Sequence, residues 1–241
     1  MLSKNELKYI QSLCHKKQRT AERLFIVEGV KLVQELIAEG YPVKNIYATD
    51  QWVIPGGNYP VTRISEQELD KISSLQTPNQ VLAIVHQPDL TGEPQWNNKL
   101  TLVLDGIQDP GNMGTIIRIA DWFGIDQIIA SEDTVELYNP KVIQSTMGSF
   151  MRVKVWYRDI VSLLRKQDLP VYGAVLDGQS IYDMQPPNTG ILMIGNESKG
   201  IREDVQSLIN HRITIPRIGQ AESLNAAVAL GILLSQFKRP H

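Results

Sequence analysis

The sequence predicts an α/β protein with two domains, and three observations lead to this prediction. Short β-rich apolar runs alternate with helical patterns along most of the 241 residues, as in sheets covered by helices. Residues 87–99, which contain two prolines, a glycine and many polar residues, interrupt this alternation and are typical of a linker. Beyond the linker, three apolar runs each end in a polar loop. We therefore expect one domain over residues 1–90 and a second over residues 98–241.

The first domain is expected to be a small α/β sandwich. Val33, Leu36 and Ile37 lie at helical spacing before Gly40, which predicts an amphipathic helix. The acidic residues that follow Ser65 suit the first turn of a helix. In chain order we expect a polar helix over 3–22, a strand over 24–27, a helix over 31–38, strands over 45–49 and 61–64, a helix from 65 and a strand over 81–85.

The second domain is expected to hold a mostly parallel sheet with helices on both faces. This follows because short β-rich runs again alternate with helical patterns. One helix is indicated by Ile116, Ile119, Ala120 and Phe123, which would form its buried stripe. An Ala/Leu-rich helix is expected near the end of the chain. The strand candidates are 101–104, 127–130, 171–175, 190–194 and 211–215.

The composition is that of a soluble globular protein, with 42% hydrophobic and 21% charged residues. We expect no membrane span, because no apolar run approaches the roughly 20 residues that a bilayer requires. The first ten residues lack the apolar core of a signal peptide. Cys14 is the only cysteine, so we expect it to pack in the interior of a cytoplasmic protein.

The net charge of −2 argues mildly against a nucleic-acid partner, but the basic residues are clustered. Six Lys or Arg lie between Lys4 and Arg23, against two Glu. Six more lie between Lys141 and Lys166, against Asp159 alone. Either cluster could bind phosphate, or each could be a solvated helix face.

The first polar loop leads into a helix that carries Asn112, Gly114 and Arg118. Arg118 lies about 200° around the helix from Ile116, so it projects away from the buried stripe and over a bare glycine with room for a ligand. Asn112 can cap the helix or bind a substrate. The alternative for Arg118 is a surface ion pair with Asp121.

The second and third loops also end apolar runs. Gly195 permits close approach of the backbone, and Gly200 permits a positive φ before a helix that begins near Arg202. Ser223 is a natural N-cap of the final helix. Asn225 follows it as an amide that would need a partner if buried. The alternative for the second loop is an ordinary strand-to-helix turn.

Two common cofactor sites are not predicted. The Gly-x-Gly-x-x-Gly fingerprint and the Walker phosphate loop are both absent, which disfavours a Rossmann site or an NTPase. The four histidines lack ligand spacing, so we expect no metal site. In contrast, the apolar segments 193–195, 214–217 and 223–224 suit recognition of an adenine ring by backbone amides.

Three motifs together resemble the SpoU (TrmH) family of RNA 2'-O-ribose methyltransferases, in the SPOUT superfamily. They are Asn-x-Gly-x-x-x-Arg at 112–118, Gly-Asn-Glu-Ser-x-Gly at 195–200 and Glu-Ser-Leu-Asn at 222–225. Phe-Ile-Val-Glu-Gly at 25–29 also resembles the L30e-like substrate-binding domain often fused to this enzyme. The resemblance implies a deep trefoil knot, S-adenosyl-L-methionine as cofactor, RNA as partner and a homodimer.

The resemblance also implies roles for individual residues. Arg118 would be the catalytic residue at the 2'-hydroxyl, where we expect it to bind phosphate and stabilise a developing alkoxide, since a guanidinium keeps its proton at neutral pH. The other implied catalytic residues are Asn112, Glu197, Ser223 and Asn225. The implied cofactor-binding residues are Met193, Gly195, Asn196, Ile215, Ser223 and Leu224.

Ribosomal RNA is the favoured substrate, because an additional RNA-binding domain suits a structured target. The alternatives are 2'-O-methylation of transfer RNA, a non-catalytic RNA-binding protein on the same fold, and a small-molecule α/β enzyme with a nucleotide cofactor.

Overall fold

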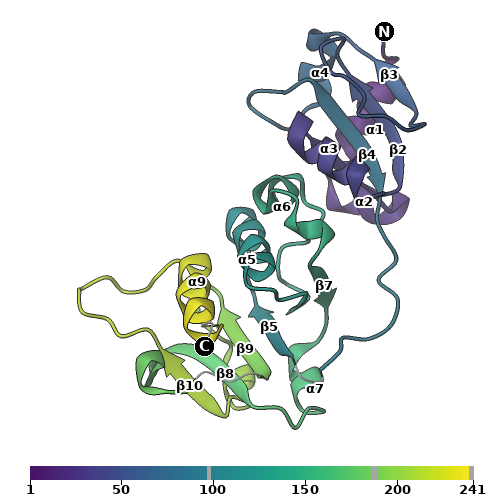
Figure 1. Cartoon of the computed structure of the whole chain (residues 1–241). Coiled ribbons are helices and arrows are strands. Elements are labelled where there is room, and N and C mark those ends of the chain that lie inside the picture. The colour runs from purple at the N-terminus through teal and green to yellow at the C-terminus, as the bar shows by residue number, and fades with distance from the viewer. Residues whose placement is uncertain (97–98, 186–188, 239–241) are drawn as a thin grey trace. The chain divides into compact units, whose positions relative to one another are not determined.

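Figure 1 shows the computed structural model, which describes residues 1–96, 99–185 and 189–238. The chain forms two compact units: one holds 1–89 together with 136–151, and the other holds 90–135 and the chain from residue 152 onward. The expected linker has neither helix nor strand where it is described; its residues Asn97 and Asn98 lie outside the described residues. Among the described helices, none has the length and hydropathy to span a bilayer.

The first unit is the predicted α/β sandwich. Its four-stranded sheet has the order β1-β4-β2-β3, and only β2 and β3 pair in parallel. Ser65 forms a capping box with Glu68 at the start of α4, as the acidic residues predicted. The elements before the linker are α1 (Lys4–Ser12), α2 (Lys16–Glu22), β1 (Leu24–Glu28), α3 (Val30–Ala38), β2 (Val43–Ala48), β3 (Val61–Arg63), α4 (Glu66–Ile72) and β4 (Val81–His86).

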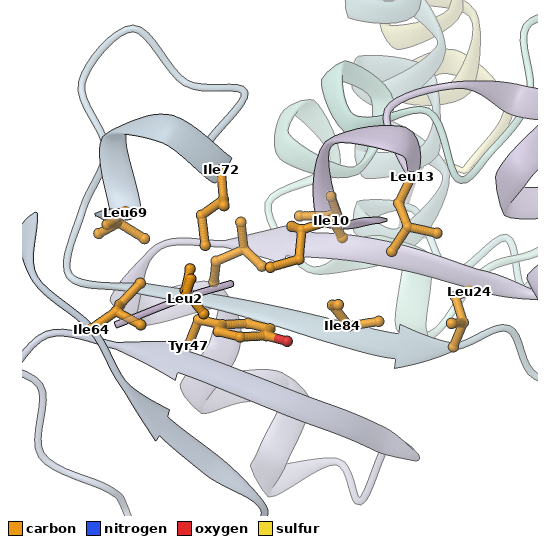
Figure 2. Close-up of a cluster of buried hydrophobic side chains, with 11 residues drawn as sticks. Leu2, Ile10, Leu13, Leu24, Tyr47, Ile64, Leu69, Ile72 and Ile84 are labelled. Atoms are coloured by element: carbon orange, nitrogen blue, oxygen red, sulfur yellow. The ribbon is translucent and has the colours of Figure 1, made fainter. Parts of the chain in front are cut away.

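One face of this sheet carries the hydrophobic cluster shown in Figure 2. Helices α1 and α4 cover this face, whereas α3 contacts β1 and β4. Cys14 is half-buried against the cluster, as expected, and burial raises the pKa of its thiol. The buried members are Leu2, Ile10, Leu13, Leu24, Ile26, Tyr47, Ile64, Leu69, Ile72, Leu82 and Ile84.

The single polar helix predicted over 3–22 is wrong, because two helices occupy this stretch. Helix α1 is capped at Leu13, whose side chain is fully buried, and α2 starts after His15. Burying Leu13 in the cluster therefore coincides with the break in the helix. Arg19 of α2 is also buried, at 2% exposure, although it was counted in a basic surface cluster.

The segment 136–151 of the first unit contains α6 (Pro140–Thr146) and the 3₁₀ turn η1 (Ser149–Met151). Helix α6 contacts β1. Phe25, the first residue of the Phe-Ile-Val-Glu-Gly motif, lies 4.7 Å from Tyr138 and 5.7 Å from Phe150, measured between ring centroids. The motif residue thus packs against a segment more than one hundred positions away in sequence.

The second unit contains a six-stranded sheet in the order β10-β8-β9-β5-β6-β7, and every pair in it is parallel. Edge strand β7 was not predicted. The elements are β5 (Leu100–Asp105), α5 (Pro110–Trp122), β6 (Gln127–Ala130), β7 (Lys154–Tyr157), α7 (Ile160–Leu164), β8 (Val171–Ser180), the 3₁₀ turn η2 (Ile181–Asp183), β9 (Gly190–Gly195), α8 (Glu203–Gln206), β10 (His211–Thr214) and α9 (Ala226–Phe237).

Helices cover both faces of this sheet, as predicted. Val103 and Met193 pack with α7 and α8 in one hydrophobic cluster. Consecutive strand residues point to opposite faces, so Leu104 and Ile194 point to the other face, where α9 contacts β9 and packs on α5. The trefoil knot stays a prediction.

The buried stripe of α5 is rotated relative to the prediction. Met113, Ile116, Ile117 and Ala120 are fully buried, whereas Ile119 and Phe123 are only partly buried. The buried face of α5, a helix that packs against α9, thus includes Met113 and Ile117, which the predicted stripe left out.

Because all six strands are parallel, their carboxyl ends meet at one edge of the sheet. Central strands β5 and β9 pair directly, with Asp105 opposite Gly195. The loops that follow these two strands therefore start side by side at the edge where α/β proteins bind ligands.

Candidate functional site

The first loop places Asn112 in the first turn of α5 without using its side chain as a cap. The cap is Asp109, whose carboxylate accepts a hydrogen bond of 2.7 Å from the backbone N–H of Asn112. Pro110 takes the first helical position, where no N–H is needed. The sequence left open whether Asn112 caps the helix, and the structure frees its amide for other contacts.

Asn112 joins all three predicted loops. Its Nδ2 donates a hydrogen bond to the Glu197 carboxylate in the second loop. Its Oδ1 accepts a hydrogen bond of 2.8 Å from Nδ2 of Asn225, at the end of the third loop. Three of the predicted catalytic residues therefore form one continuous hydrogen-bonded group, although 113 positions separate Asn112 from Asn225.

The predicted N-cap of the final helix is corrected by the structure. Asn225, not Ser223, caps α9, because its Oδ1 accepts hydrogen bonds from the backbone N–H groups of Ala227 and Val228 at 3.0 and 3.2 Å. Asn225 is also exposed rather than buried. Its two side-chain atoms thus have separate tasks, since the oxygen caps the helix and the nitrogen binds Asn112. Ser223 is exposed in the preceding loop.

The second loop folds back tightly on itself. A Cβ at Gly195 would lie 2.3 Å from the backbone of Gly200, and Gly200 has the predicted positive φ of +69°. Asn196 and Gly200 exchange backbone hydrogen bonds of 3.0 and 2.9 Å. The Asn196 side chain accepts from two N–H groups of its own loop and donates to the Gly106 carbonyl at 2.7 Å. Asn196, a predicted cofactor ligand, therefore shapes the loop and ties it to the first.

Sequence reasoning missed a second connection between β5 and this loop. Asp105 is 1% exposed, and its carboxylate accepts hydrogen bonds from the backbone N–H of Arg202 at 2.8 Å and from the guanidinium Nε at 2.7 Å. Burial alone would lower the pKa of Arg202, but its hydrogen bond and the charge of Asp105 raise it overall. The available signal was an aspartate at the end of a mostly apolar strand, which requires a partner when buried.

Arg118 lies on the exposed face of α5, as predicted. The alternative pairing with Asp121 does not occur, because Asp121 binds Arg152 through contacts of 2.9 and 2.8 Å. Within the described residues Arg118 makes no hydrogen bond or ion pair. Gly114, over which Arg118 was expected to pass, is buried. Arg118 is a free cation on α5, six residues or just under two helical turns after Asn112.

The residues predicted to bind the cofactor divide into two kinds. Met193 and Gly195 are buried at the end of β9, so only their backbone atoms could contact a ligand. The third loop instead exposes apolar side chains: Leu224 is 46% exposed, Ile218 is fully exposed, and Ile215 is half-buried. Exposed apolar side chains beside a polar group fit an adenine ring and a polar tail, as S-adenosylmethionine has.

Two concave cavities in this unit, of about 650 and 500 Å³, contain no residue of the three motifs. The larger lies at the amino ends of β8 and β10, at the opposite edge of the sheet from the loops. The candidate site therefore lies at the three motif loops and not in either of these cavities. Among the described residues no cluster of His, Cys, Asp and Glu could hold a metal ion.

The two basic clusters are less continuous than the sequence suggested. In the later cluster, Lys141 belongs to the first unit and the other members to the second. Arg158 lies over the Trp156 ring and 3.7 Å from Glu93, and Arg152 is paired as described above. In the earlier cluster Arg23 pairs with Asp89. The exposed lysines that remain there are Lys4, Lys8, Lys16 and Lys17 on α1 and α2.

The fold and the loops define a two-part α/β enzyme that builds a polar site at the carboxyl edge of a parallel sheet. Comparison with known proteins agrees. The sequence profile of the SpoU rRNA Methylase family matches residues 99–235. The profile of the MRM3-like substrate binding domain matches residues 4–83. The chain belongs to the SpoU rRNA methylase family.

Three relatives are similar over nearly the whole chain. The 23S rRNA (guanosine(2553)-2'-O)-methyltransferase RlmP of Bacillus subtilis is 33% identical over 91% of this chain and 90% of its own. A solved TrmH-family structure from Porphyromonas gingivalis is 39% identical, covers 99% of both chains and has a TM-score of 0.88. An AdoMet-bound rRNA methyltransferase from Sinorhizobium meliloti is 28% identical, with a TM-score of 0.86 over 99% of this chain and 97% of its own.

Asn225→Asp separates the two tasks of Asn225. The carboxylate keeps the acceptor that caps α9 and loses the donor to Asn112. We expect an unchanged unfolding midpoint and methyl transfer slower by about tenfold, the loss equivalent to roughly 1.4 kcal/mol. The matched variant Asn225→Ala should also lose about 1 kcal/mol of stability, because it removes the cap. Wild-type methyl transfer by Asn225→Asp would show that the bond to Asn112 is dispensable.

Proposed function

We propose that this protein is an S-adenosylmethionine-dependent methyltransferase that methylates a ribose 2'-hydroxyl of ribosomal RNA. Its similarity to RlmP over 91% of the chain and to the AdoMet-bound enzyme from S. meliloti supports the reaction and the cofactor. The names of both relatives specify rRNA, which favours ribosomal over transfer RNA. The MRM3-like domain match supports a separate substrate-binding part.

One observation carries the proposal: the amide of Asn112 holds Glu197 and Asn225 together at the carboxyl edge of the sheet, at the start of the helix that carries the exposed Arg118. Each polar atom is already oriented before a ligand arrives, which lowers the cost of organising the site during reaction.

S-adenosylmethionine, when bound, supplies a methyl group activated by a positively charged sulfonium. We assign its adenosine to backbone atoms at the end of β9 and to the exposed side chains of the third loop, Ile215, Ser223 and Leu224. Arg118 would bind the RNA phosphate next to the reacting ribose and stabilise negative charge as it develops on the 2'-oxygen. Asn112, Glu197 and Asn225 would fix the start of α5, which carries Arg118.

The four exposed lysines of α1 and α2 support RNA binding by the first unit. An ammonium group contacts the phosphate backbone without reading sequence, so these residues would add affinity. The choice of nucleotide would then depend on the second unit.

Arg118→Ala should abolish methyl transfer, because it removes the exposed guanidinium that we assign to the RNA phosphate and the developing charge on the 2'-oxygen. Calorimetric titration should show cofactor binding within about twofold of wild type, since Arg118 lies on a different loop from the proposed adenosine contacts. Arg165→Ala, which removes an exposed arginine outside the motifs, is the matched control. Wild-type turnover by Arg118→Ala in a tritiated-methyl assay would contradict the catalytic assignment.

Mass spectrometry of RNA from cells with and without the gene tests the substrate. We expect one ribose methyl group to be missing from ribosomal RNA in the deletion strain, and to return with the wild-type gene but not with Arg118→Ala. Loss of a methyl group from transfer RNA alone would overturn the choice of substrate. No change in either RNA would favour the non-catalytic alternative.

We also propose a homodimer formed through α5 and α9. Trp122, at the end of α5, is 85% exposed, and Val228 of the adjacent helix α9 is 52% exposed. A tryptophan with this exposure is a frequent anchor of interfaces. Trp122→Glu should therefore convert a dimer into a monomer in sedimentation analysis, whereas Leu176→Glu, which changes an exposed residue of β8, should not. A dimer that survives Trp122→Glu would refute this surface.

A further inference from the structure

A buried ion pair fastens the segment 136–151 to the first unit. Arg19 of α2 and Glu136 form this pair, and their side chains are 2% and 17% exposed. Arg19 also donates a hydrogen bond of 2.8 Å from Nη1 to the Leu13 carbonyl. The guanidinium therefore connects the break between α1 and α2 with a residue that precedes α6.

This pair is better suited to fixing a position than to adding stability. Removing two charges from water costs much of what their attraction returns, so buried pairs stabilise folds weakly. The Nε of Arg19 has no hydrogen-bond partner within the described residues, which adds to the cost. Removing one partner, in contrast, leaves an uncompensated buried charge. Any arrangement that separates Arg19 from Glu136 is therefore strongly disfavoured.

Further contacts hold the same segment in place. Tyr138 and Phe150 pack on Phe25, as described above. Gly148 approaches Glu35 so closely that a Cβ would lie 2.6 Å from its carboxylate. The segment therefore sits on the first unit over most of its length, and the ion pair lies at its first residue.

The residues directly before Glu136 hold the first motif loop, within the second unit. The backbone N–H of Val135 donates to the Ile107 carbonyl at 2.8 Å. The N–H of Gly106 donates to Oγ of Ser131 at 2.8 Å, and this hydroxyl is 2.9 Å from that of Thr134. Residues 131–135 thus bind both residues that follow β5.

The same loop is bound from its other side by the second motif. The Gly106 carbonyl accepts the hydrogen bond from Asn196, so this residue is held by Ser131 through its N–H and by Asn196 through its oxygen. Only two residues separate Gly106 from the α5 cap Asp109. A displacement of Val135 would therefore be passed to the start of the helix that carries Arg118.

We propose that Arg19 and Glu136 are positioning residues for methyl transfer: by fixing residue 136 on the first unit, they hold residues 131–135 and thereby the first motif loop in its reactive arrangement. The kinetic part of this proposal rests on the proposed function, whereas its structural part does not.

Hydrogen exchange of the full-length protein tests the structural part without any assay of activity. In Glu136→Gln the peptides that contain the Gly106 and Val135 amides should exchange faster, on the order of tenfold, because opening of this loop becomes easier. Peptides from β1 and β4 should exchange as in wild type. Arg23→Gln, which breaks the exposed pair with Asp89 in the same unit, should change neither set. Unchanged exchange at Gly106 and Val135 would overturn the proposal.

Steady-state kinetics test the catalytic part. Glu136→Gln and Arg19→Met should lower kcat on the order of tenfold, since small displacements of catalytic groups are costly, and should leave KM for ribosomal RNA within about twofold. Arg19→Lys, which keeps the positive charge, should recover most of the wild-type kcat. If the other variants fail to fold, hydrogen exchange and kcat are measured on Arg19→Lys instead. A raised KM with wild-type kcat, or a lowered unfolding midpoint with wild-type kcat and exchange, would reject the positioning role. Inactivity of the wild-type protein would refute the proposed function and leave the exchange result standing.

Discussion

The parallel pairing of β5 with β9 is the constraint on which the site depends. Their register sets Asp105 opposite Gly195, so the loops after both strands begin at adjacent points of one sheet edge. Asp105 then binds Arg202 on the far side of the second loop, and Asn196 binds Gly106. A shift of this register would separate residues that the backbone alone cannot bring back together.

Within that frame, the polar side chains of the site mostly bind one another. Asn112 uses its donor for Glu197 and its oxygen for Asn225, while Asn225 also caps α9. Such interdependence means that loss of one amide disturbs two loops and a helix end together. Arg118 makes no hydrogen bond or ion pair within the described part of the chain, which leaves its charge available for a phosphate or a developing oxyanion.

Much of this arrangement was predictable from the sequence. The alternating apolar runs predicted a parallel sheet, and the rule that parallel strands end at one edge predicted that their loops would meet. The assignments that failed depended on tertiary context. Ser223 and Asn225 are both good N-caps, and only the path of the third loop selects Asn225. The stretch 3–22 has the composition of one helix, but burial of Leu13 interrupts it.

The sequence alone determined the fold class, the three loops and the residue types that the chemistry requires. It could do so because periodicity and turn preferences are local properties of the chain. Only the tertiary structure decided which side chains bind one another. The partners Arg19 and Glu136 are more than one hundred residues apart, and neither has a local signal that names the other. Pairing of this kind follows from packing in three dimensions, which brings together charges that must be matched once they leave water.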